Sequence, residues 1–72
     1  MAIEHTTASL LIDLLRELSS ELDLHYEDDE LPAAASTMAV MQRAANVLER
    51  NGFTAPDSYQ HILGRFAGGR RQ

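Results

Sequence analysis

The longest regular pattern of apolar and polar residues in this chain is TASLLIDLLRELSSELDLHY, from Thr7 to Tyr26. When successive residues are placed about 100° apart, as in an α-helix, four leucines form a central stripe: Leu11, Leu15, Leu18 and Leu22. Leu10 and Leu14 widen the stripe on one side, and Ile12 widens it on the other. The apolar arc is roughly 200° wide, whereas a surface helix needs somewhat more than 100°. The pattern therefore predicts a helix near residues 7–25 that is covered on two sides.

This broad arc has two explanations. Later helices of the same chain can cover it, or part of it can meet a second copy or another protein. The chain has 72 residues and no cysteine, and a core of this size supplies only roughly 3–5 kcal/mol of net stability. Oligomerisation is a further source of stability. We therefore predict that Leu10, Ile12 and Leu14 form an oligomer or partner-binding surface, and that the chain is a homodimer formed through this helix.

A second helical pattern follows Leu31-Pro32. Proline suits the first position of a helix and disfavours a helical residue before it, so this helix is expected to begin at Pro32. Its apolar arc is centred on Met41 and includes Ala34, Met38, Ala45 and Leu48, with Val40 and Val47 at one edge. Asn51-Gly52-Phe53 predicts its end, because glycine adopts the left-handed conformation that closes many helices.

The remaining apolar residues predict a third, shorter helix. Thr54 is the expected N-cap, with Pro56 in the first turn, and Thr6 or Thr7 would cap the first helix in the same way. The apolar residues recur at helical spacing: Tyr59, Ile62, Leu63 and Phe66.

The predicted fold is an all-α, three-helix bundle with helices near residues 7–25, 32–51 and 55–67. It forms a single domain over residues 1–67, followed by a flexible basic tail over residues 68–72. The expected core consists of Leu11, Leu15, Leu18, Leu22, Met41, Ala45, Leu48, Phe53, Ile62, Leu63 and Phe66.

Charge is distributed unevenly along the chain. Residues 1–35 contain nine acidic residues and one arginine, a formal charge of −8, and residues 36–72 contain five arginines and two acidic residues, a charge of +3, which together give −5. Four of the acidic residues are consecutive: Glu27, Asp28, Asp29 and Glu30. These carboxylates have two interpretations. They lie where the positive end of the second helix dipole stabilises acids, and they form an acidic patch suited to a basic partner protein.

Function is predicted from these surfaces because no catalytic or metal-binding motif is found. The predicted function is that of a non-enzymatic protein–protein interaction module, which binds, and in binding inhibits, a partner with a basic surface. We expect no cofactor and no metal. No apolar run approaches the ~20 residues of a membrane span, and the N-terminus lacks the pattern of a signal peptide. The expected location is therefore the cytoplasm.

The alternative function is that of a small DNA-binding regulator. Residues 44–65 contain a helix, a turn with glycine and a second helix, as in helix-turn-helix proteins. The residues that would contact DNA lie within 56–71: Gln60, His61, Arg65, Arg70 and Arg71. The acidic first half opposes this function, because affinity for DNA depends on neutralising phosphates.

Overall fold

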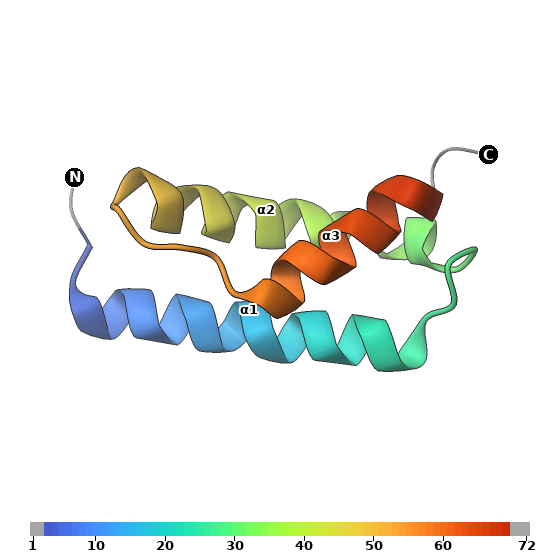
Figure 1. Ribbon diagram of the computed structural model, residues 1–72, viewed down its shortest axis with the longest axis horizontal. Coiled ribbons are helices and arrows are strands. Elements are labelled where there is room, and N and C mark those ends of the chain that lie inside the picture. The colour runs from blue at the N-terminus through green and yellow to red at the C-terminus, as the bar shows by residue number, and fades with distance from the viewer. Residues whose placement is uncertain (1–2, 70–72) are drawn as a thin grey trace.

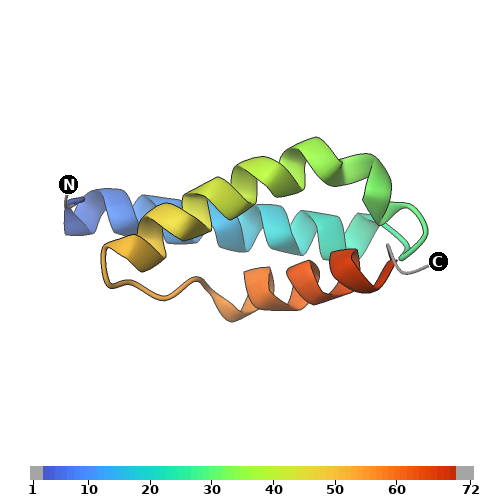
Figure 2. The same ribbon diagram turned by 90° about the horizontal axis from the view of Figure 1, so that it is seen from above.

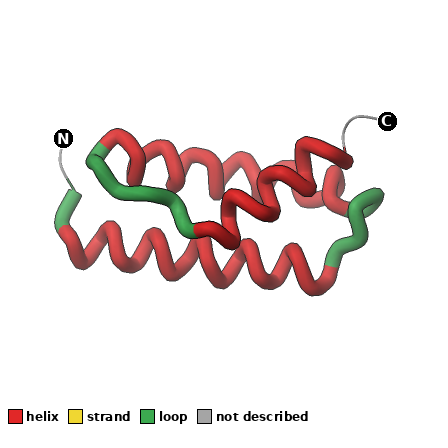
Figure 3. The backbone as a smooth tube through the Cα atoms, in the orientation of Figure 1, coloured by secondary structure: helices red, strands yellow, loops and turns green. Residues whose placement is uncertain are grey.

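The computed structural model describes residues 3–69 of the chain. It contains helix α1 (His5–His25), a 3-10 turn η1 (Leu31–Ala34), helix α2 (Ala35–Arg50) and helix α3 (Asp57–Gly69). The described residues contain no strand, so the predicted all-α bundle of three helices is confirmed (Figure 3). None of these helices combines the length and the apolar character that crossing a membrane requires.

The three helices form an elongated bundle in which α1 and α2 run antiparallel (Figure 1). A hydrogen bond from the Ile3 backbone N–H to the Asn51 side-chain oxygen, 3.1 Å long, joins the start of α1 to the end of α2. Helix α3 lies along the pair on one side only, which is visible when the bundle is seen from above (Figure 2). The opposite side of the α1–α2 pair is therefore left without a third helix.

The start of each helix differs from the prediction. Helix α1 begins two residues early, after Glu4, which makes no side-chain cap, so neither Thr6 nor Thr7 is the cap. The first amide groups of α1 are on exposed residues, where solvent can satisfy them without a cap.

The second and third helices begin three and two residues later than predicted. Pro32 lies in the turn η1, where Leu31 and Ala34 are buried, and α2 begins only at Ala35. Thr54 is not the N-cap of α3, because the helix begins only at Asp57, three residues later, and Ala55 between them is buried. The backbone oxygen of Pro56 accepts the first amides of the helix instead, from Tyr59 at 3.0 Å and Gln60 at 3.2 Å.

The predicted end of the second helix is confirmed in detail. Gly52 has a φ of +84°, the left-handed conformation. The Phe53 amide donates to the Leu48 oxygen at 2.9 Å, and the Gly52 amide donates to the Glu49 oxygen at 3.2 Å. These two bonds define a Schellman motif, which satisfies the last carbonyl groups of a helix. Helix α3, by contrast, continues through Gly68 and Gly69, two residues past its predicted end, and residues 70–72 of the predicted tail lie outside the described residues.

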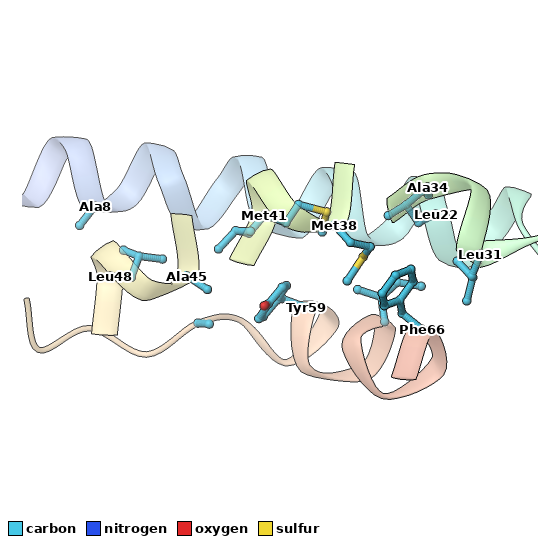
Figure 4. Close-up of a cluster of buried hydrophobic side chains, with 13 residues drawn as sticks. Ala8, Leu22, Leu31, Ala34, Met38, Met41, Ala45, Leu48, Tyr59 and Phe66 are labelled. Atoms are coloured by element: carbon cyan, nitrogen blue, oxygen red, sulfur yellow. The ribbon is translucent and has the colours of Figure 1, made fainter. Parts of the chain in front are cut away.

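The core runs along the bundle between all three helices (Figure 4). Its buried apolar residues are Ala8, Leu15, Leu22, Leu31, Ala34, Met38, Met41, Ala45, Leu48, Ala55, Tyr59, Ile62 and Phe66. Of the predicted core, Leu11, Phe53 and Leu63 are only partly buried against this cluster. The prediction for Leu18 is wrong, since its side chain is 39% exposed.

Helix α1 is rotated relative to the prediction, and this rotation explains the position of Leu18. Ser19 is fully buried, and Asp23, one turn further on, pairs with Arg65 of α3. The buried stripe of α1 is therefore centred between Leu15 and Ser19 rather than on Leu11. A small residue at Ser19 fits this position because it allows a neighbouring helix to approach closely.

Two glycines give a matched test of this backbone. Replacing Gly52 by alanine should lower the free energy of unfolding by about 1 kcal/mol, because an L-residue is strained at positive φ. Replacing Gly64, in the middle of α3, should raise it by about 0.5–1 kcal/mol, because a Cβ there meets no atom within 4 Å and alanine favours the helix. Urea unfolding followed by circular dichroism measures both changes. If both variants changed the free energy of unfolding in the same direction, the left-handed conformation of Gly52 or the helical one of Gly64 would be contradicted.

Candidate interaction surfaces

Helix α1 presents a row of exposed leucines. Leu10, Leu14 and Leu18 are 58%, 49% and 39% exposed, and their spacing of four residues places them along one edge of the helix. Because Asp23 marks the edge of α1 that faces α3, the leucine row lies on the other edge, toward α2. Helix α3 therefore cannot cover these three side chains.

Helix α2 contributes two exposed valines to the same side of the bundle. Val40 and Val47 are 58% and 36% exposed and lie two turns apart. The opposite edge of α2 carries Glu49 and faces α3, where burial and then the nearby Glu49 carboxylate raise the pKa of Tyr59. Leu10, Leu14, Leu18, Val40 and Val47 together form a surface that we call the α1–α2 face.

The predicted apolar surface of Leu10, Ile12 and Leu14 thus overlaps only partly with the α1–α2 face. Leu10 and Leu14 are exposed side by side, whereas Ile12 is partly buried and packs against the core on the other edge of α1. Leu18, Val40 and Val47 are not among the residues predicted for this surface. The edge position of the two valines in the apolar arc of α2 was the signal that could have identified them.

The acidic loop, residues 27–30, connects α1 to η1 at the end of the bundle where α1 finishes. All four of its residues are exposed. The Glu27 amide donates to the Glu30 carboxylate at 2.7 Å, and the Glu30 amide donates to the Glu27 backbone oxygen at 2.9 Å. Asp28 accepts a hydrogen bond from Arg65. The Asp28 and Glu30 carboxylates thus each accept a hydrogen bond within the chain, while the Glu27 and Asp29 carboxylates have no such partner among the described residues.

Arg65 of α3 fastens this loop to the rest of the bundle. Its Nε donates to Asp28 at 2.8 Å, and Nη2 donates to the Tyr26 backbone oxygen at 2.8 Å. Nη1 donates to the Asp23 carboxylate at 2.8 Å and to the Asp23 backbone oxygen at 3.2 Å. The planar guanidinium group suits several acceptors at once. The side chain is only 21% exposed, so most of its surface is occupied by these contacts.

Asp23 forms the ion pairs that join α1 to α3. Its carboxylate accepts from Arg65 and also lies 3.2 Å from His61 Nε2. The hydrogen bond from Arg65 is the main cause that lowers the pKa of Asp23, and the same pairing raises the pKa of Arg65. Asp23 and Arg65 thus remain charged partners over the range where most proteins function.

Of the residues predicted for DNA binding, the three that the structure describes do not form a common basic surface. Gln60 and His61 are exposed on α3, but the Arg65 guanidinium is directed at the acidic loop and the end of α1. Arg70 and Arg71 lie outside the described residues. His61 itself contacts the Asp23 carboxylate, so acidic groups stand beside both described cationic candidates.

The three histidines have separate neighbours. The His5 ring packs edge-on against Phe53 with ring centroids 5.6 Å apart, and His25 lies 3.5 Å from Glu21. His61 is paired with Asp23. Within residues 3–69, no cluster of three or more histidine or acidic side chains has the geometry to hold a metal ion.

The role of Arg65 can be tested against a second arginine. Arg65→Ala should lower the free energy of unfolding by about 1–2 kcal/mol, because it removes charge-assisted hydrogen bonds between three segments. Arg16→Ala, which removes only a 3.3 Å exposed pair with Asp13, should change it by less than about 0.5 kcal/mol. Chemical denaturation measures both, and equal effects would contradict the fastening role of Arg65.

Comparison with known proteins assigns no family to this chain. No protein-family model, no curated protein and no solved structure matches it. The surfaces described above are therefore the basis for the function proposed next.

Proposed function

We propose that this chain is a non-enzymatic protein–protein interaction module, which forms a homodimer through the α1–α2 face and binds a partner protein with a basic surface. The observation that carries the proposal is the row of Leu10, Leu14 and Leu18, exposed together along one edge of α1. Single exposed apolar residues are ordinary on protein surfaces, whereas a contiguous row is typical of interaction sites. Val40 and Val47 extend this row across to a second helix.

The acidic loop supports the choice of a basic partner. Glu27 and Asp29 extend from the end of the bundle without ion pairs among the described residues, and the chain as a whole carries a formal charge of −5. The negative electrostatic potential of these carboxylates accelerates the approach of a positively charged protein. A protein that covers a basic surface in this way also blocks it, so the proposed activity includes inhibition of that partner, in the cytoplasm.

The dimer is tested by changing the two most exposed leucines of the row. Replacing Leu10 and Leu14 together by serine should weaken self-association on the order of a hundredfold or more, because each buried leucine contributes roughly 1.5–3 kcal/mol. Light scattering should then report the 8.0 kDa chain rather than twice that mass. Leu24→Ser is the matched control, since Leu24 is 76% exposed but lies away from the row. A wild-type protein that is monomeric at millimolar concentration would contradict the dimer.

The acidic loop is tested with Glu27→Gln and Asp29→Asn, because these carboxylates have no structural partner to lose. A basic protein captured from a host lysate by the wild-type chain should associate several-fold more slowly with this double variant at low salt. The difference should vanish at high salt, where exposed charges are screened. Neutralising Glu4 and Asp13, two acids remote from the loop, is the control. Unchanged association rates would exclude a steering role for the loop.

A further inference from the structure

The two edges of the α1–α2 face carry opposite charges. On α1, Glu17 follows Leu14 by three residues, which places it outside the leucine row, away from the core, and Glu21 continues the line of the row beyond Leu18. On α2, Arg43 and Arg50 follow Val40 and Val47 by the same three residues and lie outside the valines. The face is thus acidic along its α1 edge, apolar in the middle and basic along its α2 edge.

The charged side chains at the two edges form almost no ion pairs within the described part of the chain. Glu17, Arg43 and Arg50 form no ion pair among the described residues, and Glu21 has only a 3.5 Å contact with the exposed His25. By contrast, Asp23, on the other edge of α1, is fully engaged with α3.

We infer that the occupant of the α1–α2 face is the same face of a second copy, placed so that α1 of each chain packs on α2 of the other. This inference rests on the proposed function, whose dimer it makes specific. The twofold axis then runs parallel to the helices, so that α1 of each chain is antiparallel to α2 of the other. Each acidic edge meets a basic edge, so that Glu17 lies on the same side as the partner's Arg43, about one helical turn from its level and within reach of the long arginine side chain, and this pairing occurs twice because the interface is symmetric.

The apolar side chains match in the same arrangement. Ala8 and Leu48 lie at one end of the core and Leu22 and Ala34 at the other, which sets the levels of α1 and α2 along the bundle (Figure 4). An axis parallel to the helices preserves these levels between the two copies. Leu10 then lies opposite the partner's Val47, and Leu14 and Leu18 lie on either side of the partner's Val40.

The alternative pairing of the two faces places like charges together. If α1 packed on the partner's α1, the acidic edge of α1 would meet the acidic edge of the partner, and the basic edge of α2 would meet the partner's basic edge. Like charges opposed across an interface disfavour it.

The pairing is tested by charge reversal in the full chain. Glu17→Arg alone and Arg43→Glu alone should each weaken the dimer about tenfold, because each changes two attractive contacts into repulsive ones. The double variant E17R/R43E should restore wild-type affinity, because it restores opposite charges across the interface. Arg16→Glu, a reversal on the α3 edge of α1, should have no effect on the dimer. Sedimentation equilibrium at low salt measures the dissociation constants, and circular dichroism checks that each variant remains helical.

The outcomes separate this inference from the proposal on which it rests. Weakening by both single reversals together with recovery in the double variant supports the pairing of α1 with the partner's α2. A wild-type dimer that the reversals leave unchanged, or that the double variant weakens further, overturns this pairing but leaves dimerisation intact. A monomeric wild type overturns the dimer itself.

Discussion

A third helix of 13 residues packs against a pair of helices of 21 and 16 residues, and it can cover only one side of that pair. Ala55, Tyr59, Ile62 and Phe66 occupy the groove on that side and draw the buried stripe of α1 toward them. Residues 3–69 contain no further helix for the opposite side. The exposed leucines of α1 and valines of α2 follow from this shortage, since their apolar character suits a packed interface that the chain itself does not supply.

Arg65 gives the acid-rich half of the chain its internal organisation. It reaches from α3 to the last turn of α1 and to the acidic loop, so that one cation holds two carboxylates and two backbone oxygens. The consecutive acids are therefore not equivalent. Asp28 helps to hold the fold, Glu30 accepts the Glu27 amide, and Glu27 and Asp29 are left to act on the surroundings.

The two surfaces lie on different parts of the bundle and can act together. The α1–α2 face runs along its length, and the acidic loop closes one end (Figure 1). In a dimer whose axis is parallel to the helices, the two acidic loops lie at the same end. The proposed dimer would present the free carboxylates of both chains toward one basic partner, without using the residues proposed to hold the two copies together.

The sequence by itself determined the three helices, the end of α2 and the excess of apolar surface on α1. These features depend on local spacing and on one glycine, so they are readable without the fold. The tertiary structure decided which part of the broad leucine arc is buried, because the packing of α3 rotates α1 until Ser19 faces inward and Leu18 faces outward. It also decided that Arg65 serves the acidic loop, since that contact joins residues 37 positions apart and no local pattern specifies it.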